Sequence, residues 1–104
     1  MTLAGRKRLE IARALATGPK LLLLDEVLAG LTATEVADAL EMIRELHRRY
    51  RLTLVVIEHV MGALMRLCNR IVVLHHGEKI AEGTPDRVVA EPRVIEAYFG
   101  ARPR

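Results

Sequence analysis

The spacing of apolar residues predicts a helix near the start of the chain. Within residues 6–16, Leu9, Ala12 and Leu15/Ala16 fall on one helical face, and charged side chains lie around it: Arg6, Arg8, Glu10 and Arg13. Gly18-Pro19 follows, a pair that ends helices. The sequence therefore predicts an amphipathic helix that packs through one side.

The next two elements are a strand and a helix. Residues 20–26, KLLLLDE, form a short and continuously apolar run, as expected of a strand covered on both faces in a parallel sheet. Residues 35–49 have the helical spacing again. Thr32 and Thr34 are both candidate N-caps, and Thr32 has Glu35 three residues later, which is the spacing of a capping box.

The second half of the chain repeats the alternation and then changes. Residues 52–59, LTLVVIEH, predict a second buried strand, and residues 61–67 predict a short helix. Residues 70–83 contain two β-rich runs around a His-Gly pair, which is typical of a hairpin. Pro85 and Pro92 each mark a helix start. Strands that alternate with amphipathic helices indicate an α/β fold with a parallel sheet.

Length and composition narrow the class of protein. The chain has 104 residues, 51% of them hydrophobic and 28% charged, which suits one globular domain or a piece of one. A net charge of +3 is too small to require an anionic partner. Cys68 is the single cysteine, so no internal disulfide forms. The longest apolar runs are far shorter than the ~20 residues of a membrane span, and we expect a soluble protein without a signal peptide.

Ionisable residues follow both predicted parallel strands. Asp25 and Glu26 end the first strand, and Glu58 and His59 end the second. Ligands of open parallel sheets bind at the carboxyl ends of the strands. Two neighbouring acids there suit metal-assisted phosphate hydrolysis, in which one carboxylate holds Mg²⁺ and the other polarises water. Strand ends that simply turn to solvent remain the alternative.

Several stretches, in order, resemble the ATP-binding cassette (ABC) ATPases. The stretches LLLLDE and AGL are similar to the Walker B strand and D-loop of that family, and VVIEH to the strand that ends in the switch histidine. RKRLEIARALATGPK resembles the helix after the signature motif, and RIVVLHHGEKIAEGTPDRV the closing hairpin. The resemblance implies the C-terminal half of a P-loop NTPase domain over residues 1–104. The stretches RLEIARAL and VIEAYFG, and Met61 after IEH, are most like the branched-chain amino acid group.

The resemblance assigns roles to individual residues. It makes Asp25 the ligand of Mg²⁺, through water, and Glu26 the general base. It makes His59 the switch histidine that contacts the γ-phosphate of ATP. The D-loop, which reaches a second ABC ATPase subunit, consists of Ala29, Gly30 and Leu31.

The first residues, MTLAG, stand where the family commonly has the signature Leu-Ser-Gly-Gly-Gln. The resemblance places Thr2, Ala4 and Gly5 on the nucleotide, with the Thr2 hydroxyl at the serine position. A helix that begins just after would direct its N-terminal N–H groups at the same anion. The chain departs from the family's pattern at several positions. Leu3 and Ala4 replace two glycines, and Gly5 replaces a glutamine. Val27 replaces a proline, and Thr32 and Asn69 each replace an aspartate.

Two family motifs are absent from the sequence. It contains no G-x-x-x-x-G-K-S/T loop and no Gln-loop before the signature. We therefore expect the chain alone to be inactive and to need an N-terminal half that carries the P-loop. The other implied partners are a second ATPase subunit and membrane permease subunits, which would place the chain in the cytoplasm, peripheral to the inner membrane. No nucleic acid is expected, because aromatic residues make up only 3%.

Three alternatives stay open at this point. In the first alternative, the chain is a non-catalytic α/β interaction module or a truncated relic of an ABC ATPase. In the second, it is part of an ABC ATPase that acts on DNA or ribosomes. In the third, Met1 is an internal codon of a longer frame, because it stands at the leucine of the signature motif and domains rarely begin inside a motif.

Overall fold

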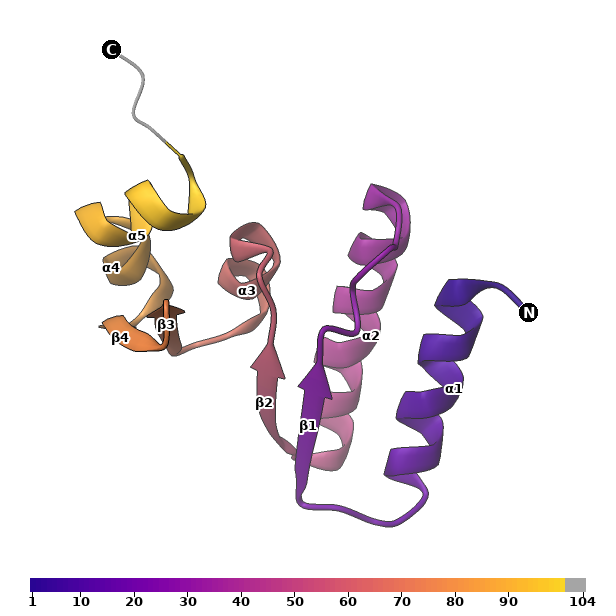
Figure 1. The fold of residues 1–104 in the computed structure, drawn as a ribbon. Helices are drawn as coiled ribbons and strands as arrows, with labels where there is room; N and C mark the ends of the chain where they lie inside the picture. The colour runs from indigo at the N-terminus through magenta and orange to yellow at the C-terminus, as the bar shows by residue number, and fades with distance from the viewer. Residues whose placement is uncertain (101–104) are drawn as a thin grey trace. The chain divides into compact units, whose positions relative to one another are not determined.

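A computed structural model of the protein describes residues 1–100, and they form two compact units, one of Met1–Glu58 and one from His59 onward. The first unit contains helix α1 (Leu3–Leu15), strand β1 (Leu21–Asp25), helix α2 (Ala33–Tyr50) and strand β2 (Thr53–Ile57). The second contains helix α3 (Met61–Leu67), strands β3 (Ile71–His75) and β4 (Glu78–Gly83), and helices α4 (Pro85–Val89) and α5 (Pro92–Tyr98). Figure 1 shows these elements in order.

The first unit is built on a parallel pair of strands joined through a helix. Strands β1 and β2 run side by side in the same direction (Figure 1), with Leu21 opposite Thr53 and Asp25 opposite Ile57. Helix α2 forms the connection between them. The predicted βαβ unit is therefore confirmed, and both strands end at the same edge.

The caps of α1 and α2 explain where each helix begins. The Thr2 hydroxyl oxygen accepts a hydrogen bond from Gly5 N at 3.0 Å, so α1 begins at Leu3, three residues earlier than expected. Thr32 and Glu35 form the full capping box at the start of α2. Thr32, and not Thr34, is thus the N-cap of α2.

Burial in the first unit is one-sided. On β1, the side chains of Leu22 and Leu24 are 5% and 3% exposed, whereas those of Leu21 and Leu23 are 57% and 59% exposed. The prediction of a strand covered on both faces is wrong within the first unit, because helices α1 and α2 of that unit cover only the face that Leu22 and Leu24 occupy.

Helix α1 presents a different face to the core from the one that the spacing predicted. Ile11 is buried, at 6% exposure, while Leu9 is 48% exposed and Ala12 is exposed as well. The prediction of a buried Leu9–Ala12 face is therefore wrong. In the core of the unit Ile11 is joined by Leu40 and Ile43 of α2, which are 0% and 2% exposed.

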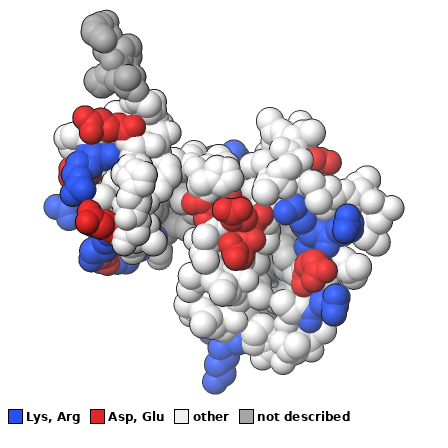
Figure 2. Space-filling view, viewed as in Figure 1, with Lys and Arg blue, Asp and Glu red and all other residues white. Residues whose placement is uncertain are grey.

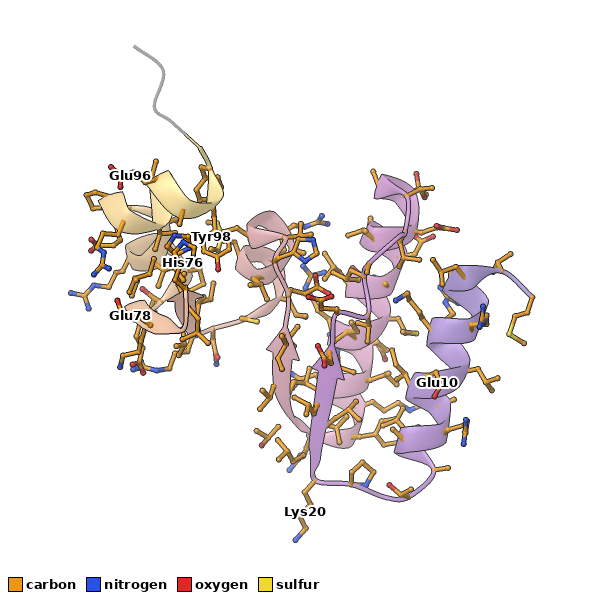
Figure 3. The ribbon with its side chains drawn as sticks, viewed as in Figure 1. Glu10, Lys20, His76, Glu78, Glu96 and Tyr98 are labelled. Carbon is orange, nitrogen blue, oxygen red and sulfur yellow. The ribbon has the colours of Figure 1, made fainter. Side chains whose placement is uncertain are left out.

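The second unit contains the predicted hairpin. Strands β3 and β4 pair antiparallel, and the two-residue turn His76-Gly77 has positive φ at both positions, 51° and 77°, as a type I′ turn requires. The ring of Tyr98 in α5 (labelled in Figure 3) lies edge-on to the ring of His75, with 6.4 Å between the centroids, and its hydroxyl donates a hydrogen bond to the Leu74 carbonyl. Helices α4 and α5 each begin at a proline, as expected.

Two side chains of the second unit have shifted pKa values. The hydrogen bonds and charges of Lys79 and Arg70 lower the pKa of Glu82 to about 2. Cys68 caps the C-terminus of α3 and is half-buried, and burial raises the pKa of its thiol. A raised pKa lowers the thiolate fraction, so this thiol is a weak nucleophile.

None of the helices in the described part of the chain has both the length and the apolar character needed to cross a bilayer.

Candidate functional site

Asp25 and Glu26 lie together where β1 ends, and both are exposed. The Glu26 N–H donates to the Ile57 carbonyl at 2.8 Å, which extends the pairing of β1 and β2 by one residue. Glu26 has φ 52°, a left-handed conformation that is uncommon outside glycine. Figure 2 shows acidic side chains gathered on this face of the unit. The structure thus presents both predicted carboxylates to solvent at the strand end.

The loop after the acids is held by contacts at both of its sides. The Ala29 N–H donates to the Glu26 carbonyl and the Leu31 N–H to the Leu28 carbonyl, each at 3.2 Å. Lys7 Nζ of α1 donates to the same Glu26 carbonyl at 3.3 Å. These bonds fix the backbone around residues 27–31, the loop that contains the predicted D-loop at 29–31.

Leu28 fixes the same loop through both its side chain and its backbone. The side chain is only 4% exposed. The Leu28 N–H donates to Glu58 Oε2 at 3.1 Å, so the loop is also attached to the residue that follows β2.

Ala29 and Gly30 form the exposed part of this loop. Gly30 has φ 79°, and a Cβ placed on it would lie 2.8 Å from Leu3 Cδ2 at the start of α1. The loop and the N-terminus of α1 are therefore in close contact. The structure brings the predicted D-loop beside the predicted signature tail.

A cavity of about 310 Å³ lies where α1, the loop and α2 meet. It is lined by Thr2, Ala4 and Gly5 of the predicted nucleotide contacts, together with Lys7, Leu31 and Met42 among others. Because the Thr2 oxygen already accepts from Gly5 N, its hydroxyl hydrogen is left to donate elsewhere. The first turn of α1 has no intrahelical acceptors for its N–H groups and so favours an anion.

The end of β2 places Glu58 and His59 in different surroundings. Glu58 is half-buried, and its Oε1 is buried with no hydrogen-bond partner among the described residues. His59 is exposed and opens the second unit. The pairing of His59 with the two acids in one site stays a prediction.

Sequence reasoning missed two contributors to this region, Lys7 and Glu58. The sequence pattern gave no role to Lys7, and it placed Glu58 only at a polar strand end. Both act through the loop backbone, by contacts 19 and 30 residues apart in sequence. A local pattern carries no signal for either contact. The one usable sign was an acid placed directly before the predicted switch histidine.

Comparisons with known proteins show what the chain is similar to. Residues 78–103 match the sequence family described as "Branched-chain amino acid ATP-binding cassette transporter". The chain is 42% identical over 95 residues to the high-affinity branched-chain amino acid transport ATP-binding protein LivG of Escherichia coli K12, and 41% identical to BraF of Pseudomonas aeruginosa. Each alignment covers 91% of this chain and 37% of the relative, so the chain spans little more than a third of these proteins.

Solved structures give the same result. The fold matches the ADP conformation of an ATP-binding cassette of an ABC transporter with a TM-score of 0.84 and 30% identity, over 97% of this chain and 41% of that one. A nucleotide-free cassette matches with a TM-score of 0.83, again at 30% identity and over 97% and 41% of the two chains. The chain therefore belongs to the ATP-binding cassette family, in the group of transporter ATP-binding subunits that includes LivG and BraF.

Proposed function

We propose that the chain forms the C-terminal portion of an ATP-hydrolysing subunit of an ABC transporter for branched-chain amino acids. The observation that carries this proposal is the pair Asp25-Glu26, exposed at the carboxyl end of a parallel strand and followed by a fixed loop against the N-terminus of α1. The names of LivG and BraF supply the solute class.

Glu26 is the proposed general base. Its carboxylate is exposed, so it can accept a proton from a water molecule that attacks the terminal phosphate of ATP. Its backbone is tied to Ile57 on one side and to Lys7 on the other, which limits how far the carboxylate can move. His59, the residue after Glu58, is the proposed contact of the γ-phosphate.

Asp25 suits Mg²⁺. Its exposed carboxylate is a hard oxygen ligand, and Mg²⁺ in nucleotide sites is usually bound by one or two carboxylates together with phosphate and water. Among residues 1–100 no three potential metal ligands gather in one place, which agrees with a site that takes its other ligands from nucleotide and water. When bound, Mg²⁺ would neutralise charge that develops on the phosphates.

The N-terminus of α1 is the proposed contact with the nucleotide of the second subunit. The Thr2 hydroxyl has a hydrogen to donate, and Ala4 and Gly5 line the cavity next to it. Thirteen residues of helix, Leu3–Leu15, align their peptide dipoles toward this end. We propose that this segment binds phosphate as the family's signature does, despite Leu3 and Ala4 in place of glycine.

The implied partners follow from the same surfaces. Ala29 and Gly30 are exposed and so are available to a second ATPase subunit. The bare face of β1 and β2, with Leu21, Leu23 and Ile57 at 57%, 59% and 47% exposure, suits the remainder of a cassette that carries the P-loop. Permease subunits would hold the assembly at the cytoplasmic side of the inner membrane.

The bare apolar face also favours a second candidate function. An exposed sheet face can serve a protein that only binds a partner and hydrolyses nothing. In that case the acids at the end of β1 would be solvated strand ends. The two functions differ in whether Glu26 affects turnover.

A chimera tests the proposal. This chain replaces the matching 95 residues of E. coli LivG, so that the rest of LivG is present in the same polypeptide. Glu26→Gln should leave ATP binding unchanged and lower turnover by ~10²–10⁴-fold, the range for loss of a general base. Glu10→Gln, an exposed glutamate of α1, is the matched control and should have wild-type turnover. Wild-type turnover in the Glu26 variant would refute the assignment.

A further inference from the structure

Only one of the two carboxylate oxygens of Glu58, beside the candidate site, accepts a hydrogen bond among residues 1–100. Its Oε2 accepts the Leu28 N–H at 3.1 Å, while its Oε1 is buried and has no hydrogen-bond partner among residues 1–100. Burying a charged oxygen without a partner costs free energy, and a native structure contains few such atoms. The side chain therefore calls for a role that offsets the cost.

The contact with Leu28 continues the pairing of β1 and β2 beyond the end of the sheet. The last backbone bond of the pair runs from the Glu26 N–H to the Ile57 carbonyl, at 2.8 Å. The next attachment uses the Glu58 side chain in place of backbone and reaches two residues further, to Leu28. The segment from Glu26 to Leu28 is thus joined at two successive points, to the last residue of β2 and to the residue after it.

Glu58 suits this position better than a neutral acceptor. A hydrogen bond from a backbone N–H to a carboxylate is shorter and stronger than one to an uncharged oxygen. The Leu28 side chain is 4% exposed, so the loop cannot lift from β2 without opening this part of the core. The two contacts together leave Ala29 and Gly30 exposed on a fixed base.

We propose that Glu58 is a positioning residue, whose carboxylate holds loop 27–31 on the end of β2 and so fixes Glu26 and the exposed Ala29-Gly30 for catalysis. The catalytic part of this statement rests on the proposed function, whereas the hold on the loop does not. His59 is the next residue in the chain, so the same short segment serves both the loop and the predicted switch histidine.

Amide hydrogen exchange of the 104-residue chain tests the hold on the loop without nucleotide. Glu58→Ala should speed exchange of the Leu28 amide by about 10- to 100-fold, as loss of a hydrogen bond to a charged group does. Glu58→Gln keeps an acceptor oxygen and should retain most of the protection. Glu45→Ala, which removes a surface ion pair of α2, is the control and should leave the Leu28 amide unchanged.

The result that overturns the hold is a Leu28 amide that stays protected in Glu58→Ala, or one that exchanges equally fast in the Ala and Gln variants. Circular dichroism and the exchange of the β1 and β2 amides show whether a variant has unfolded as a whole. Equal acceleration across both strands in Glu58→Ala, with no excess at Leu28, also counts against a local role.

The LivG chimera tests the catalytic part. Glu58→Ala should lower kcat by about 10- to 100-fold with nucleotide affinity unchanged, since a small displacement of a catalytic group has effects of this size. Glu58→Gln should recover most of kcat. If Glu58→Ala speeds hydrogen exchange of the Leu28 amide but leaves kcat unchanged, the catalytic part of the proposal is wrong. If the wild-type chimera itself hydrolyses no ATP, the proposed function fails, and the exchange experiment still decides the hold on the loop.

Discussion

Gly30 links the exposed loop to the N-terminus of α1, and its replacement by alanine is the most informative stability test. Two penalties act at Gly30: φ is 79°, and a Cβ would lie 2.8 Å from Leu3 Cδ2. Gly18 has φ 71° with no atom within 4 Å of a Cβ, so Gly18→Ala isolates the backbone penalty. Gly62, in α3, has neither penalty and is the control.

The expected magnitudes follow from these differences. A left-handed conformation costs an alanine about 1–2 kcal/mol, and the entropy that alanine removes from the unfolded chain returns about 0.4–1 kcal/mol. Gly18→Ala should therefore destabilise the chain by about 0.5–1.5 kcal/mol. Gly30→Ala should cost about 0.5–1.5 kcal/mol more, the strain of moving Leu3 off its rotamer. Gly62→Ala should stabilise by roughly 0.5–1 kcal/mol.

Urea unfolding followed by far-UV circular dichroism measures all three free energies of unfolding on the same chain. Leu3→Ala should remove the extra cost of Gly30→Ala and leave that of Gly18→Ala unchanged, because only Gly30 meets Leu3. Equal effects of Gly18→Ala and Gly30→Ala would refute the contact between the loop and α1. A neutral Gly18→Ala would refute the backbone argument itself.

Three further outcomes are expected. Leu40→Ala, at a side chain that is 0% exposed, should cost about 2–5 kcal/mol in urea unfolding, whereas Leu9→Ala, 48% exposed, should cost well under half of that. The pKa of Glu82 is lowered to about 2, so its ion pairs stabilise the folded chain above its ordinary pKa of 4.5 and are lost as pH falls through about 2. Glu82→Gln should remove that part of the acid sensitivity, and an unchanged pH profile of thermal unfolding would refute it. Sedimentation should show self-association of the isolated chain that Leu23→Lys with Val55→Lys reduces, and a wild-type monomer would contradict this.

Most elements of the fold could be predicted because they depend on local patterns. The run KLLLLDE and its counterpart LTLVVIEH gave both parallel strands, and the structure bounds them at Leu21–Asp25 and Thr53–Ile57. The capping box at Thr32 and the His-Gly turn fixed a helix start and a hairpin register, since each rests on residues close in sequence.

The burial of α1 could not be predicted because its apolar residues lie on more than one side. Leu9 and Ile11 are two residues apart and cannot both face the core of one helix. The structure buries Ile11, which lines the same cavity as Ile43 of α2, and leaves Leu9 exposed. Which of the two residues is buried depends on the element that packs against α1. The sequence of α1 alone does not identify that element.

The acidic residues of the candidate site could be predicted from the sequence, whereas the hydrogen bonds that hold the loop beside them could not. Asp25 and Glu26 were found because they follow an apolar run, whereas Thr2, Ala4 and Gly5 were found only because MTLAG stands at the signature position of the resembling family. The bonds from Lys7 to the Glu26 carbonyl and from Leu28 to Glu58 join residues from separate elements, so no spacing rule predicts them.

Uptake of a branched-chain amino acid tests the central claim most directly. In E. coli cells that lack LivG, the chimera with this chain in place of the matching 95 residues is the only source of that subunit. We predict that the chimera restores uptake of radiolabelled leucine and that Glu26→Gln abolishes it at equal protein level, with Glu10→Gln as the active control. A chimera that assembles with its permease and gives no uptake would contradict the account, as would wild-type uptake by the Glu26→Gln variant.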